Sequence, residues 1–108
     1  MTSYATKTRE SEIEADLTEA VSATHGRAYK FTSPGRRAVP DRLVLMPIEN
    51  EEHRAIVAKY VRFVELKAAG GVPTKPQIRE HEKLFRLGHV VVISSDTTHN
   101  DEIVNSMS

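Results

Sequence analysis

Residues 60–94 leave few folding options open, because they read as a strand, a helix and a second strand. Residues 60–67 are β-branched and aromatic with alternating apolar side chains, which is typical of a β-strand. A glycine pair ends it, Thr74 is the expected cap of a helix that stops at Gly88, and residues 90–94 form a short apolar strand. A helical crossover predicts that the two strands lie parallel in one sheet, with the fully apolar one in its interior.

The first half of the chain adds one helix and two strands. Ser11 opens a pattern of period 3.6 that Gly26 is expected to stop. Residues 28–32 and 41–46 are strand candidates separated by turn residues, while residues 48–59 fit either a short helix or a long hairpin loop. The predicted order is α-β-β-β-α-β. We expect an α/β (α+β) fold in which the first three strands form an antiparallel meander within a mixed sheet flanked by helices.

Composition limits the function classes. The chain has 108 residues, 39% of them apolar and no cysteine, which suits one domain and excludes disulfides, thiolate zinc sites, iron–sulfur clusters and cysteine nucleophiles. It has no apolar run of membrane-spanning length and no signal-peptide pattern, so we expect a cytoplasmic protein. The expected boundaries are a frayed N-terminus over residues 1–10, a domain over residues 11–95 and a flexible tail over residues 96–108.

Charge is balanced overall but unevenly distributed. The 15 basic and 15 acidic side chains cancel, yet residues 26–45 contain five basic residues and one acidic residue, and residues 72–90 contain four basic and two acidic ones. Residues 1–20 and 91–108 are acidic. This distribution indicates either a basic face for an anionic partner or a mixed solvated surface.

Two carboxylates and a lysine are expected to meet at one sheet edge. Asp41 begins one predicted strand, and Glu65 and Lys67 end the next, where they share a face while Leu66 turns away. If these strands form a hairpin, Asp41 lies beside Glu65 and Lys67. Carboxylate oxygens, with the Leu66 backbone carbonyl, suit Mg²⁺ or Mn²⁺, and Lys67 could orient a water molecule or stabilise phosphate charge. The alternative is a surface ion pair and an ordinary turn.

The motifs G-R-x-x-x-P-D over residues 35–41, F-V-E-L-K over residues 63–67 and K-P-Q over residues 75–77 occur in this order. In this respect residues 10–95 resemble the stand-alone VRR-NUC domain of the PD-(D/E)xK nuclease superfamily. The resemblance implies a restriction-endonuclease-like core and a metal-dependent nuclease. It implies that Asp41 and Glu65 are metal ligands, Lys67 is the catalytic lysine and Gln77 lies near the reacting phosphate. Residues 47–59 depart from it, being longer than a tight turn.

Two further candidates have structural alternatives. The resemblance places a glutamate on the first helix, where Glu14 stands, but Ser11-x-x-Glu14 also fits a capping box. Thr74-x-x-Gln77 fits the same motif. Each of these two residues is therefore either a site residue or a helix cap.

Basic residues flank the candidate site in the sequence. We expect them to contact the DNA backbone, the alternative being a solvated surface; they are Arg36, Arg37, Lys75 and Arg79. The five histidines show no metal-ligand spacing, since Phe85 stands where a zinc motif starting at His81 needs a second histidine. We interpret them as structural.

The sequence therefore predicts a Mg²⁺-dependent DNA endonuclease, for which Mn²⁺ can substitute. One site in each chain and two strands in duplex DNA favour a homodimer, and the stand-alone proteins it resembles suggest branched DNA such as four-way junctions. The alternatives are a non-catalytic nucleic-acid-binding module with the same fold and a small interaction domain.

Overall fold

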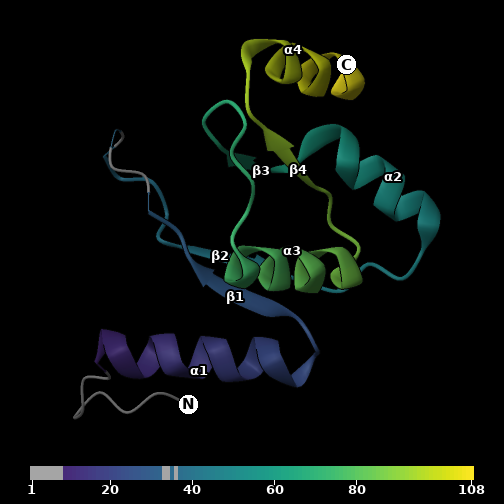
Figure 1. Ribbon diagram of the computed structural model, residues 1–108. Helices are drawn as coiled ribbons and strands as arrows, with labels where there is room; N and C mark the ends of the chain where they lie inside the picture. Colours follow the sequence, from purple (N-terminus) through teal and green to yellow (C-terminus); the bar gives the residue numbers. More distant parts are fainter. Residues whose placement is uncertain (1–8, 33–34, 36) are drawn as a thin grey trace. The chain divides into compact units, whose positions relative to one another are not determined.

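The computed structural model describes residues 9–32, 35 and 37–108. The chain divides into an N-terminal unit, Met1–Met46, and a C-terminal unit, Pro47–Ser108, and each is described by itself. The helices and strands follow one another as shown in Figure 1: α1 Glu10–Ala23, β1 Arg27–Lys30, β2 Arg42–Leu45, α2 Glu51–Tyr60, β3 Phe63–Leu66, α3 Lys75–Leu87, β4 Val91–Ser94 and α4 Thr97–Met107.

The N-terminal unit is a helix followed by a β-hairpin. β1 and β2 pair antiparallel, with Lys30 opposite Arg42. Val21 of α1 and Leu45 of β2 are its buried apolar residues. Gly26 makes the tight connection from α1 to β1, because a Cβ at this position would lie 2.6 Å from the Leu45 carbonyl oxygen. The helix and both strands predicted for this half of the chain are confirmed.

The start of α1 differs from the expected capping box. The helix begins at Glu10, its N-cap residue is Arg9, and no side chain caps it. Ser11 therefore lies inside the first turn, where its hydroxyl is not at the cap position. The capping-box interpretation of Glu14 is wrong, and its carboxylate is instead paired with Arg42 of β2.

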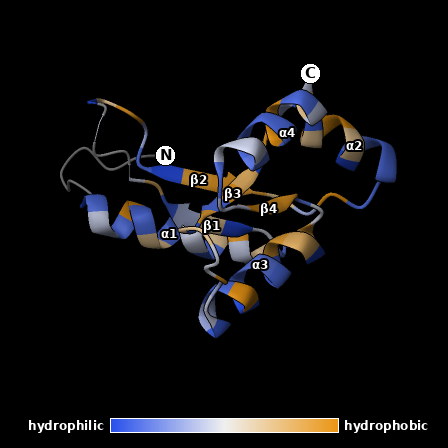
Figure 2. Cartoon of the chain, turned by 45° about the horizontal axis from the view of Figure 1, so that its top comes forward, coloured by the Kyte–Doolittle hydropathy of each residue, from blue (hydrophilic) through white to orange (hydrophobic). Residues whose placement is uncertain are grey.

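The strand–helix–strand prediction for the C-terminal unit is confirmed. β3 and β4 pair parallel, with Phe63 opposite Val91. Between them, α3 starts at a Thr74 cap and ends at Gly88, whose φ of 98° is the left-handed conformation that glycine adopts without strain. Gly88 also permits close packing, since a Cβ there would lie 2.7 Å from the Ile48 carbonyl oxygen. Figure 2 shows mostly hydrophobic residues in β3 and β4, with hydrophobic and hydrophilic residues alternating along α3.

Residues 51–60 form α2, which settles the choice between helix and loop. The Asn50 side chain caps this helix by accepting hydrogen bonds from the backbone N–H groups of Glu52 and His53. Because α2 includes Tyr60, the next strand begins at Phe63, and the prediction of a strand from residue 60 was wrong at that end.

The predicted three-stranded meander is also wrong. β1 pairs with β2 and β3 pairs with β4, so the described residues form two small two-stranded sheets. A ten-residue helix separates β2 from β3 in the chain, which leaves no tight hairpin connection between them. β4 has β3 as its one partner in the described part of the chain, so its placement in a sheet interior was wrong too. The fold is mixed α/β, and the restriction-endonuclease-like core stays a prediction.

A fourth helix occupies the region expected to be a flexible tail. Asp96 caps α4 by accepting a hydrogen bond from the backbone N–H of His99. Arg62 holds its far end through a 2.6 Å hydrogen bond from Nη1 to the Ser106 hydroxyl. A cap and a long-range contact thus order residues whose polar composition alone indicated a loose tail. Over the described residues, no helix combines the length and the apolar character that crossing a membrane requires.

Candidate active site

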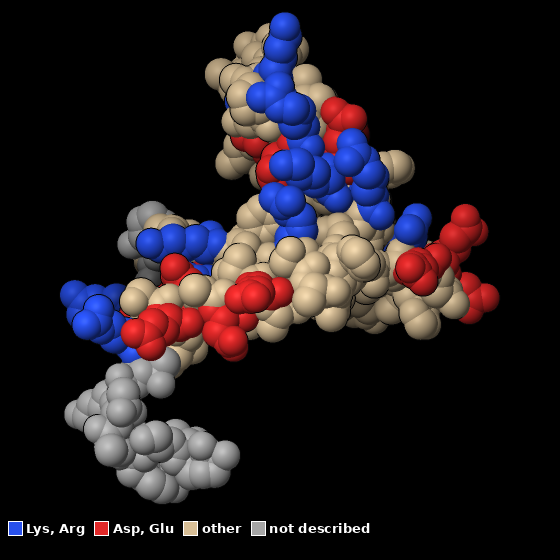
Figure 3. Space-filling view, turned by 90° about the horizontal axis from the view of Figure 1, so that it is seen from below, with Lys and Arg blue, Asp and Glu red and all other residues tan. Residues whose placement is uncertain are grey.

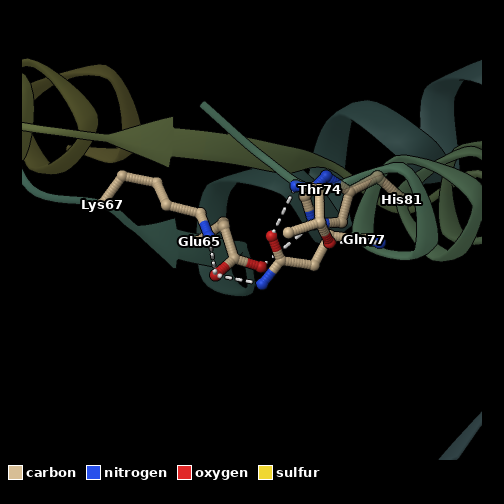
Figure 4. Close-up of polar contacts among 5 residues, drawn as sticks. All are labelled: Glu65, Lys67, Thr74, Gln77 and His81. Atoms are coloured by element: carbon tan, nitrogen blue, oxygen red, sulfur yellow. Dashed lines mark hydrogen bonds and ion pairs between the residues drawn. The ribbon is translucent and has the colours of Figure 1, made fainter. Parts of the chain in front are cut away.

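Glu65 and Lys67 extend from β3 on the same side, as the alternation of a strand predicts. The Lys67 ammonium Nζ lies 4.0 Å from Glu65 Oε2 (Figure 4). Only 25% of the Glu65 side chain and 19% of the Lys67 side chain are exposed. At this burial a charge interacts more strongly with its neighbours than it does in bulk water. The two residues form a half-buried ion pair rather than the exposed surface pair that was the alternative.

Helix α3 brings two more polar side chains to Glu65. Gln77 and His81 are four residues apart and therefore lie on one face of the helix. Gln77 Nε2 donates to Glu65 Oε2 at 3.3 Å, and His81 Nε2 lies 3.3 Å from Glu65 Oε1. Both carboxylate oxygens thus have partners, and the carboxylate is held in one orientation.

These side chains line a pocket of the C-terminal unit with a volume of about 280 Å³. Its apolar walls come from both strands and the helix, and include Phe63, Leu84 and Val91. The Glu65 carboxylate therefore lies on a partly apolar wall of the pocket. There the Gln77 and His81 side chains replace some of the water molecules that would solvate it at the surface. A small charged group could approach it from the open side.

Gln77 is the helix cap that the sequence predicts, and its side chain also contacts Glu65. Its side-chain Oε1 accepts a hydrogen bond from the Thr74 backbone N–H at 2.9 Å, and its own N–H donates to the Thr74 hydroxyl at 3.3 Å. This completes the predicted capping box. The cap leaves the amide Nε2 directed at Glu65 (Figure 4). Gln77 thus couples the start of α3 to the carboxylate on β3.

Asp41 lies just before β2 in the N-terminal unit and is exposed, with 75% of its side chain accessible. Its Oδ2 is 3.7 Å from Arg42 Nη1, and its backbone carbonyl accepts hydrogen bonds from Arg42 Nη1 and the Phe31 N–H. Arg42 also pairs with Glu14. Asp41 and Glu14 line one pocket of about 130 Å³, so two carboxylates proposed as metal ligands share it with one guanidinium.

No group of three or more histidine or acidic side chains suited to hold a metal occurs within residues 9–32, 35 and 37–108. The candidate oxygen ligands are instead divided between the units, with Glu14 and Asp41 in one and Glu65 in the other. The predicted hairpin between the strands of Asp41 and Glu65 does not form. The meeting of Asp41 with Glu65 and Lys67 therefore stays a prediction.

The basic residues predicted to contact DNA have different surroundings. Lys75 and Arg79 are exposed on the first two turns of α3, and Arg37 is exposed in the turn before β2. Arg36 lies outside the described residues. On the face drawn in Figure 3, Lys and Arg side chains form several dense groups.

Sequence reasoning missed His81 and Arg42. His81 was interpreted as structural because it lacks metal-ligand spacing, but its spacing of four residues from Gln77 indicated that both face the same neighbour. Arg42 directly follows Asp41, and no local pattern indicated that it would pair with Glu14, 28 positions earlier.

Together these features define a mixed α/β protein with a glutamate–lysine pair held between a strand and a helix. Comparison with known proteins shows that the chain is similar to a phage protein. The chain is 48% identical over 85 residues to a protein named "Putative nuclease p44" from Acyrthosiphon pisum secondary endosymbiont phage 1, and the match covers 79% of this chain and 81% of the relative. The chain belongs to the same family as this phage protein. No model of a known protein family matches it, and no solved structure does.

Proposed function

We propose that this protein is a metal-dependent DNA endonuclease that hydrolyses phosphodiester bonds. The observation that supports it most directly is the half-buried Glu65–Lys67 pair with Gln77 and His81 around the carboxylate. A carboxylate held in place beside an ammonium is the arrangement that positions a cation and a phosphate near each other. The phage relative, named a nuclease, supports the same activity.

The available side chains fit a hard divalent cation, because every proposed ligand is an oxygen atom. We propose that Asp41, Glu65 and the backbone carbonyl of Leu66 hold Mg²⁺, with Mn²⁺ as a substitute, and that Glu14 is a further ligand. A cation there would polarise the phosphodiester and acidify a bound water molecule. Arg42 offsets part of the negative charge of the pocket lined by Glu14 and Asp41, so a cation must compete with that guanidinium.

Lys67 and Gln77 act on the reacting phosphate in this proposal. The Lys67 ammonium is anchored 4.0 Å from Glu65, which restricts its long side chain to the neighbourhood of the carboxylate. From there it can donate hydrogen bonds to a phosphate oxygen or to the attacking water molecule. The Gln77 amide is fixed by the capping box at the same place. Both groups are thus positioned before substrate arrives.

The motifs support a finer family assignment as part of this proposal. G-R-x-x-x-P-D ends at Asp41, F-V-E-L-K contains Glu65 and Lys67, and K-P-Q ends at Gln77. We propose that this set makes the chain a stand-alone VRR-NUC protein with a PD-(D/E)xK site. The parallel pairing of β3 and β4 around α3 is compatible with such a core.

For the substrate we propose branched duplex DNA such as a four-way junction, cut by a homodimer. One chain supplies one candidate site, and cutting two strands in a coordinated way is simplest with two sites related by a two-fold axis. Arg37, Lys75 and Arg79 would contact the backbone, with Arg36 in the same role. Light scattering at micromolar concentration measures the dimer, and competition between junction and linear duplex measures the preference.

The second candidate is a nucleic-acid-binding module that does not cut. The presence of Asp41, Glu65 and Lys67 together favours catalysis over this alternative. The deciding experiment incubates the protein with linear, flapped and four-way DNA in the presence of Mg²⁺, Mn²⁺ or EDTA. Glu65→Gln is the inactive variant, and Glu52→Gln, at an exposed position of α2, is its matched control.

Metal binding is measured separately from activity by the shift in melting temperature on adding Mg²⁺, since a ligand that binds only the folded state stabilises it. We expect wild type and Glu52→Gln to cut DNA and to show the Mg²⁺ shift, and Glu65→Gln to lose both. DNA binding without cutting under every metal condition would favour the module instead.

A further inference from the structure

Helix α3 has a stripe of four basic side chains along one face. Lys75, Arg79, Lys83 and Arg86 are spaced by four, four and three residues. At 100° per residue these positions fall within about 80° of the helix circumference. We call this set the α3 basic stripe. Its two C-terminal members, Lys83 and Arg86, were not among the residues predicted to bind DNA.

The stripe is on a different side of α3 from the groups that fix the helix in its unit. Leu84 and Leu87 are buried, and Gln77 and His81 contact Glu65. All four members of the stripe are exposed. The stripe is therefore free to meet an external partner without disturbing the packing of α3.

Two acidic residues accompany the stripe but do not neutralise it. Glu80 Oε1 lies 3.5 Å from Lys83 Nζ, and Glu82 Oε2 lies 3.8 Å from Arg86 Nη2. Both pairs are solvent-exposed, and exposed ion pairs contribute little and are screened by salt. Lys75 and Arg79 have no ion pair with any described residue. A polyanion can thus exchange for the two glutamates at small cost.

The stripe begins at the end of α3 that carries Gln77, although on a different side of the helix. Lys75 is two residues before Gln77, whose amide contacts Glu65. From Lys75 to Arg86 the helix rises by about 16 Å at 1.5 Å per residue. One DNA strand has a phosphate about every 3.4 Å along the helix axis, so this length matches roughly five phosphates.

We propose that the α3 basic stripe binds the phosphate backbone of one DNA strand and leads it from Arg86 towards the pocket at Glu65. The proposal rests on the proposed nuclease function for its substrate and adds two residues and a direction to it. Lys83 and Arg86 would contact phosphates several nucleotides from the one being cut. They would raise affinity without reading sequence, because phosphate contacts are the same for every base.

The test measures DNA binding in EDTA, where no cutting occurs. A fluorescent duplex is titrated with protein at several salt concentrations, and the slope of log K against log salt is compared between variants. Lys83→Gln with Arg86→Gln removes the distal half of the stripe, and Lys75→Gln with Arg79→Gln removes the proximal half. Glutamine keeps a high helix propensity. Lys30→Gln with Lys59→Gln is the matched control, which removes two exposed positive charges outside α3.

Each lost phosphate contact reduces the salt slope by about 0.9 on duplex DNA. We expect each α3 double variant to lower the slope by roughly 1.8, and the control to leave it unchanged. Cutting by the distal variant should show a raised KM with kcat retained, because the lost contacts are remote from the reacting phosphate. Far-UV circular dichroism and melting temperature confirm that α3 stays folded.

An unchanged slope in the distal variant would overturn the stripe proposal, and so would an equal loss in the control. Absence of DNA binding by the wild type would overturn it as well. The nuclease proposal fails independently, if the wild type binds DNA with the expected slopes and cuts none of the substrates with Mg²⁺ or Mn²⁺.

Discussion

Glu65 and Asp41 are the two carboxylates proposed as metal ligands, and their surroundings are opposite. Glu65 is three-quarters covered and has contacts with Lys67, Gln77 and His81 from two elements of the C-terminal unit. Asp41 is mostly exposed in the N-terminal unit, and its side chain has one ion pair among the described residues, with the adjacent Arg42. One carboxylate is held in place by the fold, while the other is free to reorient.

This difference indicates that the two carboxylates have different roles in the proposed metal site. A carboxylate that is already oriented does not lose conformational freedom when it binds a cation, whereas an exposed one does. Glu65 would therefore set the position of the metal, and Asp41 would complete its ligand set. Glu65 and Asp41 should therefore respond differently to mutation, to added metal and to the loss of neighbouring side chains.

The largest effect is expected from removing the proposed ligands and the lysine. Asp41→Ala, Glu65→Ala and Lys67→Ala should each lower the cleavage rate by at least about 100-fold, because each removes a group that binds the cation or the phosphate charge. Single-turnover cleavage of a labelled DNA measures this. If Asp41→Ala turned over like the wild type in nuclease-free preparations, the N-terminal carboxylate would have no part in the site.

A smaller effect is expected from His81, which we assign as a positioning residue for Glu65. His81→Ala should reduce activity or metal affinity by about 10–100-fold, as is typical when a partner of a metal ligand is lost. His81→Gln keeps a hydrogen-bond donor and should restore much of the activity. The Mg²⁺ concentration at half-maximal activity is the measurement that separates positioning from general destabilisation.

His53, exposed on α2, supplies the matched control, and His53→Ala should behave as wild type. Equal activity of His81→Ala and His81→Gln would show that the contact with Glu65 has no role in catalysis. A corresponding test of the neighbour of Asp41 is not clean, because that neighbour, Arg42, also pairs with Glu14.

The capping residues provide a test on stability alone. Thr74→Ala should lower the free energy of unfolding by about 1 kcal/mol, because the Thr74 hydroxyl satisfies a helix N–H and its loss also frees Gln77. Ser11→Ala should change it by less than about 0.5 kcal/mol, since Ser11 is not a cap. Urea unfolding measures both. A larger loss for Ser11→Ala than for Thr74→Ala would contradict the assigned helix starts.

The smallest effect is expected from Asp41→Asn in the metal-free protein. Asp41 is exposed, so the substitution should leave the melting temperature unchanged or slightly raised, the latter if the carboxylate repels Glu65. The same variant should weaken the stabilisation produced by Mg²⁺. Melting curves with and without Mg²⁺ decide the point. A variant that loses metal-free stability yet keeps the full Mg²⁺ shift would make Asp41 a structural turn residue.

Much of the C-terminal unit could be read from its sequence, because its signals act over a few residues. The Thr74 cap, the Gly88 stop and the alternation that places Glu65 and Lys67 on one side depend on backbone geometry within one or two turns. These predictions were confirmed, and so was the parallel pairing that a helical crossover requires.

Two local patterns of the same type have different outcomes in the structure. Ser11-x-x-Glu14 and Thr74-x-x-Gln77 both fit a capping box, yet only the second forms one. Pro76 favours a helix start at Lys75, because proline is tolerated in the first turn where its missing N–H has no partner. At α1 the N-cap residue is Arg9, two positions before Ser11, and Arg42 from β2 pairs with the Glu14 carboxylate. A residue distant in sequence thus decided the role of Glu14.

The sequence by itself therefore determined the order and type of most elements, the caps of α3 and the shared face of Glu65 and Lys67. Only the tertiary structure decided that β2 and β3 belong to separate sheets, that residues 97–107 form a helix, and that His81 contacts Glu65. The physical reason is the distance along the chain over which each interaction acts. Capping and alternation depend on neighbours along the backbone, whereas strand pairing and side-chain partners depend on which distant segments fold against each other.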